Sequence, residues 1–328
     1  MPATCDMLLR MKSRGNVVIW LKSSQKETFA PSYYKSDSYN QLLRELGARQ
    51  NLFFAYDSVS YRGNDIFEPV SEYVGGDIVP TSKQITAHAI YNLGDIPGED
   101  FKTLNAGITN APAFRKFCSS KWDTYRYLPE FSPQTIFVAT EEEFVSAVER
   151  IKTDTIVFKP NAGTNGVGVR IFERGSAPLD EEMKADIKKG AVLQEFVDTK
   201  NGLTSICGSY HDLRLATINE KIALTHVRVP EPGSRIASYQ QGATIRELAE
   251  DMLPKEIISF YAEVHKEIIA RFPRPMYSMD IGMGTSGPRL FELNGHTAFP
   301  WPDFKCKNSF IENLVAHMEG FLRPECAQ

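Results

Sequence analysis

The sequence has few cysteines, no long hydrophobic run and no excess of positive charge. The 328 residues include five cysteines, an odd number, and these are scattered along the chain: Cys5, Cys118, Cys207, Cys306 and Cys326. This pattern matches neither a disulfide framework nor a zinc site, so we expect reduced thiols and a cytoplasmic location. No apolar run is long enough to span a membrane, and the N-terminus lacks the apolar core of a signal peptide. The net charge of −4 argues against general attraction to nucleic acid or to an anionic membrane.

The composition is that of a globular protein, with 42% hydrophobic and 24% charged residues. A chain of this length can bury more than one core, so two or three subdomains are expected. Apolar runs at 16–22 and 52–56 predict strands, and a leucine stripe over 39–46 predicts a helix that ends at Gly47. This strand–helix–strand order predicts an N-terminal α/β domain over residues 1–112.

A second unit is expected over residues 113–190. It contains an apolar run at 135–138 and a capping-box signature that opens a helix over 140–152. Two further β runs follow at 155–159 and 167–172, joined by a glycine-rich segment.

A third unit is expected over residues 191–328. It begins with an apolar strand at 192–197 and includes an amphipathic helix over 255–272. A hairpin at 277–295 and a closing helix at 309–322 complete it.

The glycine-rich loop from Asn161 to Gly168 lies between two predicted strands. Dinucleotide fingerprints and Walker loops must lead from a strand into a helix, so neither motif applies here. A glycine-rich hairpin tip can still fold over phosphates, because its backbone N–H groups are exposed as donors. Lys159, just before the loop, could neutralise phosphate charge. A flexible hairpin with a surface lysine fits the same segment, so both interpretations stay open.

The predicted hairpin at 277–295 brings acidic groups together. If it folds about Ser286, Asp280 lies opposite Glu292, and strand alternation puts Asn294 on the same face as Glu292. Facing carboxylates repel and therefore need a cation. Oxygen ligands without histidine or cysteine suit Mg²⁺. The alternative is a surface hairpin with ordinary polar residues.

Three features occur in a fixed order: Phe158-Lys159-Pro160 with the glycine loop, Gln194-Glu195-Phe196-Val197, and Asp280 followed by Phe291-Glu292-Leu293-Asn294. That order resembles the ATP-grasp superfamily, and most of all carboxylate–amine ligases of the glutathione synthetase and ribosomal-protein glutamate ligase type. The resemblance covers roughly residues 110 to 300. It implies an α/β fold in which two α+β lobes clamp ATP, preceded by an N-terminal α/β pre-ATP-grasp domain.

The resemblance also implies roles for individual residues. Residues expected to bind ATP are Lys121, Lys159, Gly163, Asn165, Gly166, Gly168, Gln194, Glu195, Phe196 and Val197. Asp280, Glu292 and Asn294 are expected to bind one or two Mg²⁺ ions, with Mn²⁺ as an alternative.

Three arginines are expected to be catalytic by the same resemblance. Arg214 belongs to a segment that resembles the family's Asp-x-Arg strand, and Arg228 and Arg235 flank a Pro-Glu-Pro-Gly segment that resembles a mobile substrate loop. The segment 238–242 matches the family's Asn-x-x-x-Gly-Gly pattern only in part.

The expected reaction joins a carboxylate to an amine through an acyl phosphate, with ATP converted to ADP and phosphate. The partners would be a small carboxylate and amine, or an amino acid or peptide, with no nucleic acid or membrane. No general base is obvious, and His211 and His296 are the candidates. Alternatives are an ATP-grasp phosphotransferase acting on a small polyol and a non-catalytic ATP-binding regulator. Many members of the superfamily dimerise, so a homo-oligomer stays open, although no segment displays an interface.

Overall fold

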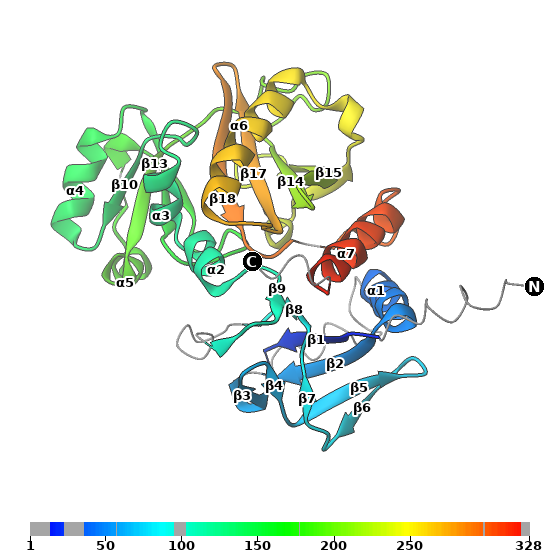
Figure 1. Cartoon of the computed structure of the whole chain (residues 1–328). Helices are drawn as coiled ribbons and strands as arrows, with labels where there is room; N and C mark the ends of the chain where they lie inside the picture. The colour runs from blue at the N-terminus through cyan, green and yellow to red at the C-terminus, as the bar shows by residue number, and fades with distance from the viewer. Residues whose placement is uncertain are drawn as a thin grey trace, which may run out of the picture. The chain divides into compact units, whose positions relative to one another are not determined.

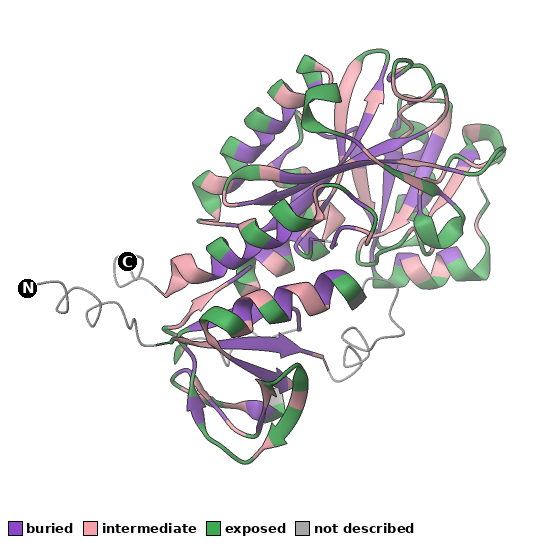
Figure 2. Cartoon of the chain, turned by 90° about the vertical axis from the view of Figure 1, so that its right-hand side faces the viewer, coloured by how far each residue is buried: buried purple, intermediate pink, exposed green. Residues whose placement is uncertain are grey.

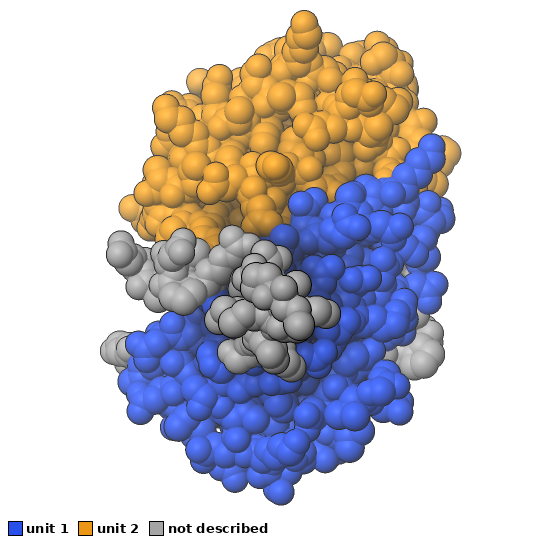
Figure 3. Space-filling view, turned by 45° about the vertical axis from the view of Figure 1, so that its right-hand side comes forward, with its two compact units in different colours: residues 1–112, 299–328 blue, residues 113–298 orange. Residues whose placement is uncertain are grey.

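The computed structural model describes residues 14–22, 36–56, 58–94, 103–176, 178–297 and 299–322. The chain divides into two compact units, Met1–Pro112 with Phe299–Gln328, and Ala113–Ala298 (Figure 3). Residues 299–328, which the sequence analysis grouped with the C-terminal lobe, thus belong with the N-terminal residues. Cys118, Cys207 and Cys306 carry reduced thiols, while Cys5 and Cys326 lie outside the described residues.

The first unit is built on a six-stranded sheet of order β6-β5-β2-β1-β8-β9 (Figure 1). Its strands are β1 (Asn16–Leu21), β2 (Asn51–Tyr56), β5 (Val70–Val74), β6 (Asp77–Thr81), β8 (Ala89–Asn92) and β9 (Gly107–Ile108). The strands β2, β1, β8 and β9 are parallel, whereas β5 and β6 are antiparallel additions. A small sheet of β3 (Tyr61–Gly63), β4 (Ile66–Phe67) and β7 (Ile85–Thr86) lies in the same unit. The parallel strands confirm the expected α/β character.

Two helices of this unit pack on the six-stranded sheet and on each other: α1 (Ser36–Arg49) and α7 (Lys307–Phe321). The prediction that α1 ends at Gly47 is wrong, because the helix continues to Arg49. A Cβ at Gly47 would lie 2.8 Å from the Tyr73 ring, so this glycine permits close packing of helix and strand.

One half of the second unit is a four-stranded antiparallel sheet of order β10-β13-β11-β12. The strands are β10 (Thr135–Val138), β11 (Thr155–Pro160), β12 (Arg170–Glu173) and β13 (Ala191–Glu195), and they carry α4 (Glu141–Arg150) and α5 (Glu181–Lys189). The predicted capping box at Thr140 and Glu143 is present. The strand β12 begins later than predicted, since the glycine loop extends to its start, and β13 ends at Glu195 rather than at 197.

The other half is a five-stranded antiparallel sheet of order β16-β15-β14-β17-β18. The strands are β14 (Asp212–Ile218), β15 (Lys221–Val229), β16 (Thr244–Glu247), β17 (Tyr277–Gly284) and β18 (Gly287–Asn294), accompanied by α2 (Pro112–Ser119), α3 (Lys121–Tyr127) and α6 (Lys255–Arg271). Leu213 and Leu215 join Ile257 and Val264 of α6 in an apolar core. Because side chains alternate along a strand, Arg214 is directed to the opposite face, where the candidate site lies.

The longest described helix is α6, with 17 residues. Figure 2 shows buried residues concentrated in the strands and exposed residues along the outer helix faces. Within the described ranges, no helix combines the length and the apolar character needed to cross a membrane.

Candidate active site

A β-bulge shapes the hairpin of β17 and β18. Gly284 pairs with Gly287 and Ile281 with Leu290, but Asp280 pairs with Glu292, so Phe291 is the extra residue. The predicted pairing of Asp280 with Glu292 is confirmed, although the turn is a two-residue loop and does not centre on Ser286. Bulges redirect side chains next to functional sites, and this one sets the position of Phe291 and Glu292.

The ring of Phe291 lies across Gly282 on the neighbouring strand. A Cβ at Gly282 would fall 2.0 Å from the ring, so only glycine leaves room for it. The ammonium of Lys159 is 5.5 Å from the centre of the same ring, which is within the range of a cation–π contact.

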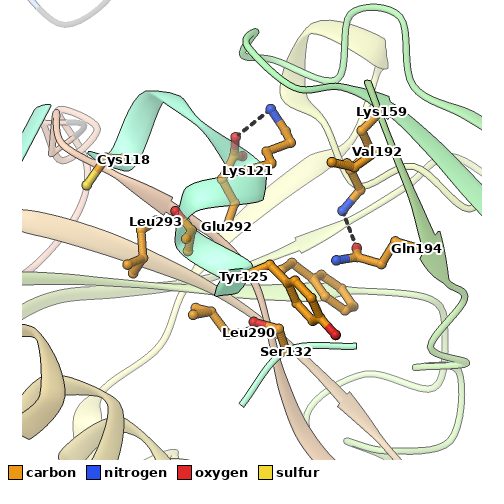
Figure 4. Close-up of a pocket in the computed structure, with 12 residues that line it drawn as sticks. Cys118, Lys121, Tyr125, Ser132, Lys159, Val192, Gln194, Leu290, Glu292 and Leu293 are labelled. Carbon is orange, nitrogen blue, oxygen red and sulfur yellow. Dashed lines mark hydrogen bonds and ion pairs between the residues drawn. The ribbon is translucent and has the colours of Figure 1, made fainter. Parts of the chain in front are cut away.

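A pocket lies beside this ring, where α3, β11, β13 and β18 converge (Figure 4). Four of the predicted site residues line it: Lys121, Lys159, Gln194 and Glu292. The Lys159 ammonium donates to the Gln194 amide oxygen at 2.7 Å, and the Gln194 amide nitrogen donates to the Thr135 hydroxyl at 2.9 Å. Removal from water lowers the pKa of Lys159 to about 8, against the opposing effect of Glu292.

Lys121 connects the glycine loop to β18. Its ammonium donates to the carbonyl oxygen of Gly163 at 2.9 Å and lies 3.2 Å from a carboxylate oxygen of Glu292. Its position is fixed at the start of α3, because Ser120 caps that helix and the Lys121 N–H donates to the Asn161 carbonyl at 3.1 Å. Figure 4 shows the Lys121 and Glu292 side chains directed toward each other.

The glycine loop has a left-handed backbone at several positions. Positive φ angles of 149°, 63°, 73° and 73° occur at Gly163, Asn165, Gly166 and Gly168. The loop is held by a 3-10 turn, Tyr239–Gln241, and its preceding residue. The Ser238 hydroxyl donates to the Asn165 carbonyl at 2.6 Å, and the Gln241 amide donates to the Gly166 carbonyl at 2.8 Å. No pattern in the sequence predicts this docking.

Basic and acidic side chains lie next to one another across the strands β15, β14 and β17. Arg214 pairs with Asp280 through two hydrogen bonds of 2.7 Å, and Arg228 pairs with Asp212 through two of 2.6 Å. A terminal nitrogen of Arg228 also lies 2.8 Å from Asp280 Oδ2. Both pairs are cross-strand neighbours in the sheet register, so the fold itself brings the four side chains together. Two predicted catalytic arginines and one predicted metal ligand therefore form one cluster.

This cluster is removed from solvent, with a side-chain exposure of 4% for Asp280. Burial alone would raise the pKa of Asp280, but Arg214 and Arg228 hold it well below its ordinary range. Burial raises the pKa of Asp212 to about 6, and the charge of Asp280 adds to this effect while Arg228 opposes it. Asp212 was not among the expected site residues, although it is the aspartate of the segment that resembles the family's Asp-x-Arg strand.

Comparisons with known proteins agree with this architecture. The structure matches D-alanyl-alanine synthetase A from Vibrio cholerae O1 biovar eltor with a TM-score of 0.63 and 13% identity, over 94% of this chain and 98% of that one. It matches the ATP-grasp ligase PsnB, complexed with a phosphomimetic variant of minimal precursor, Mg and ADP, with a TM-score of 0.59 and 14% identity, over 93% and 99% of the two chains. A Chryseobacterium gregarium RiPP-associated ATP-grasp ligase, in complex with ADP and a leader and core peptide, matches with a TM-score of 0.61 and 9% identity, over 93% and 97%.

The chain has the ATP-grasp fold. Identities this low show the fold alone. A curated relative, the "Probable alpha-L-glutamate ligase" of Rhodopirellula baltica, is 24% identical over 189 residues, which cover 57% of this chain and 43% of the relative. The chain thus spans less than half of that relative's length. No family model matches the chain.

The predicted metal ligands Asp280, Glu292 and Asn294 are two carboxylates and one amide. Asn294 Nδ2 lies 3.3 Å from Asp280 Oδ2, and a half-turn of the amide would present its oxygen there instead. Carboxylate and amide oxygens suit Mg²⁺, so the donor set fits this ion. Among the described residues, no group of three or more His, Cys, Asp or Glu side chains could hold a metal ion. A metal site at Asp280 and Glu292 would therefore also need Asn294 and an oxygen atom from a bound ligand or from water.

Some predicted ATP-grasp site residues lie apart from the cluster. Arg235 ion-pairs with Glu173 at 3.5 Å, is 40% exposed, and stacks on the rings of Phe196 and Tyr210 at 5.4 and 5.8 Å. The structure therefore does not bring Arg235 together with Arg214 and Arg228, because its aromatic neighbours hold it elsewhere.

The residues Glu195, Phe196 and Val197, which the resemblance implies as ATP-binding, lie in a segment that is hydrogen-bonded within the protein. The backbone N–H groups of Glu195 and Phe196 donate to the Gln134 carbonyl at 2.9 Å and to the Thr153 hydroxyl at 3.3 Å. The Glu195 carboxylate accepts from the Gln134 N–H at 3.1 Å. None of these three residues lines the pocket, whereas the preceding Gln194 does.

The two histidines considered as general bases are both engaged. His211 is buried, with Nδ1 3.0 Å from the Ser209 carbonyl. His296 Nε2 contacts the guanidinium of Arg115, and because a guanidinium only donates, this nitrogen accepts. Neither contact assigns a base role.

Proposed function

We propose that the protein is an ATP-dependent carboxylate–amine ligase that forms an amide and releases ADP and phosphate. The observation that carries the proposal is the buried cluster of Arg214, Arg228 and Asp280, in the same sheet as Glu292 and within an ATP-grasp fold. The pocket lined by Lys121 and Lys159 supports the binding of an anionic nucleotide next to this cluster. The likeness to D-alanyl-alanine synthetase and to peptide-bound ATP-grasp ligases supports the same chemistry.

In the first step, a carboxylate oxygen attacks the terminal phosphorus of ATP. The bond from that phosphorus to the bridging oxygen breaks, and ADP leaves with the electron pair. This transfer depends on positioning and on neutralising the oxygens of the transferring group. Lys159 and the glycine loop would bind the phosphates, and Arg214 and Arg228 would face the transferring group. Bound Mg²⁺, held by Asp280, Glu292 and Asn294, would supply further positive charge.

In the second step, an amine nitrogen attacks the acyl carbon of the acyl phosphate. The carbon–oxygen bond to phosphate breaks, phosphate leaves with the electron pair, and the amine loses one proton. Arg214 or Arg228 would stabilise the oxyanion formed on the acyl oxygen, because each presents several N–H donors on a buried face.

We propose an amino acid or a peptide as one partner. The relative from Rhodopirellula baltica is described as a probable glutamate ligase, and two structural neighbours hold precursor or leader and core peptides. We further propose one or two Mg²⁺ ions, since one neighbour is complexed with Mg and ADP.

Release of ADP and phosphate by the purified protein with Mg-ATP tests the proposal. Pools of amino acids, dipeptides and short peptides are supplied, each with and without hydroxylamine. We expect release that depends on the carboxylate partner, together with a hydroxamate of that partner. Asp280→Asn should abolish both while the circular dichroism spectrum is retained.

Other outcomes would contradict the ligase. Turnover without hydroxamate in the presence of a polyol would indicate a kinase. ATP binding without turnover on every pool would favour an ATP-binding regulator. Full activity of Asp280→Asn would exclude Asp280 as a metal ligand.

A further inference from the structure

We infer that Asp280 exchanges its contact with Arg228 for the divalent ion, while Asp212 keeps Arg228 in place, so that Arg228 becomes available to the transferring phosphoryl group only when the ion is bound. This inference rests on the proposed function and deepens it. It makes Asp212 a positioning residue and links ion binding to anion binding.

Several donors surround the Asp280 carboxylate. Its Oδ2 atom faces Arg214 Nη2 at 2.7 Å, Arg228 Nη2 at 2.8 Å and Asn294 Nδ2 at 3.3 Å, and Oδ1 faces Arg214 Nε at 2.7 Å. A carboxylate offers about four lone-pair sites, which is about two for each oxygen. The Asn294 contact is lost when its amide turns its oxygen toward the ion, and Arg214 and the ion then fill both sites on Oδ2. The contact with Arg228 must therefore be given up as well.

Arg228 is held more firmly by Asp212 than by Asp280. Its Nε and Nη2 atoms make a two-pronged contact of 2.6 Å each with Asp212, whereas Asp280 receives only one contact, from Nη2. Arg214 instead makes its two-pronged contact with Asp280. Loss of the contact with Asp280 therefore leaves Arg228 oriented by Asp212, while Arg214 cannot leave without losing both its bonds. Arg228 is the arginine that can be released at least cost.

The charges of the site balance when no ion is bound. Arg214, Arg228, Asp212 and Asp280 carry two positive and two negative charges, and Glu292 is paired with Lys121, so these groups are neutral together. A divalent cation leaves a surplus of positive charge on a buried face, and an anion is needed to balance it. The transferring phosphoryl group is such an anion.

Binding of inorganic phosphate, measured by calorimetry in EDTA and in Mg²⁺, tests the exchange without turnover. Asp280→Asn removes the negative charge that holds Arg228, so phosphate should bind about tenfold tighter than to the wild type in EDTA. Mg²⁺ should tighten phosphate binding to the wild type and leave this variant unchanged. Asp212→Asn is the matched control, because it makes the same change in charge but leaves Asp280 in contact with both arginines. It should tighten phosphate binding much less.

Equal phosphate affinity of Asp280→Asn and the wild type in EDTA would overturn the inference, and so would equal tightening in both variants. If Asp280→Asn does not fold, the wild type gives the answer by NMR. Addition of Mg²⁺ should shift the side-chain Nη2–H signal that Arg228→Lys removes, because Nη2 is the atom that contacts Asp280. An unchanged signal at saturating Mg²⁺ contradicts the exchange. Because neither measurement needs turnover, failure of the ligase assay and failure of the exchange are distinguishable.

Discussion

At the scale of single residues, Lys159 is a pocket residue whose charge changes near neutral pH. Its pKa of about 8 means that the ammonium loses its charge as the pH rises through 8. We predict that the affinity for ATP falls above pH 8, because a positive charge next to the phosphates is lost. Lys159→Arg keeps the charge to high pH, so its affinity should stay level over the same range. Binding of ATP measured from pH 6.5 to 9.5 checks this, and the same decline in both proteins would rule out Lys159 as the titrating group.

The three predicted arginines differ in their surroundings, and their substitutions should differ too. Arg228→Lys keeps a charge but loses the two-pronged contact with Asp212, and we predict a fall in kcat of about 10²-fold. Arg235→Lys changes an exposed ion pair, so kcat should stay within about fivefold of the wild type. Steady-state kinetics of the two variants decide this, and an equal loss in both would restore Arg235 to the catalytic group.

Two members of the cluster, Arg214 and Arg228, were expected only through the resemblance to the ATP-grasp superfamily. Asp280, Glu292 and Asn294, in contrast, could be placed on one hairpin from strand alternation alone. Arg235 could not be separated from Arg228, because its stacking on Phe196 and Tyr210 depends on residues distant in sequence.

At the scale of elements, the hairpin of β17 and β18 depends on Gly282. A methyl group there would fall 2.0 Å from the Phe291 ring, so the ring must move. We predict that Gly282→Ala lowers the free energy of unfolding by about 1–3 kcal/mol and weakens ATP binding. Gly208→Ala has nothing within 4 Å of the added methyl and should change stability by less than about 0.5 kcal/mol. Thermal and denaturant unfolding of both variants provide the test, and an unaffected Gly282→Ala would mean that the ring has room.

The glycine loop is held in place by hydrogen bonds from Ser238 and Gln241, and their contribution can be tested. Without the two bonds from Ser238 and Gln241, the loop backbone should open more often. In the double variant Ser238→Ala and Gln241→Ala, we predict amide hydrogen exchange in residues 163–168 faster by about 2–10-fold for each bond lost. Gln240→Ala, on the same exposed turn, should leave exchange as in the wild type. Equal exchange in all three proteins would show that the turn does not hold the loop.

The hairpin also shows what pattern reasoning can and cannot predict. The pairing of Asp280 with Glu292 follows from counting residues, yet the count is met by a two-residue turn plus a bulge at Phe291. A bulge leaves no periodic signal, and neither does the docking of Ser238 on Asn165. Both arise from contacts between segments that the sequence does not place in advance.

At the scale of the whole molecule, the alternation of strands and helices was enough to predict an α/β fold. The membership of residues 299–328 in the first unit was not predictable in that way, because α7 follows the second unit in the chain and packs on α1 and β8. Chain order favours grouping a terminal helix with its neighbours in sequence. Only the packing of the helix shows otherwise.

The proposed reaction activates a carboxylate as an acyl phosphate. Once a carboxylate partner is identified, it can be labelled with ¹⁸O in both carboxylate oxygens and turned over with Mg-ATP and the amine. Attack by the carboxylate on the terminal phosphorus transfers one of its oxygens to the phosphate that is released. We predict one ¹⁸O atom in each released phosphate, measured by mass spectrometry or ³¹P NMR. Amide formation with unlabelled phosphate would contradict the account.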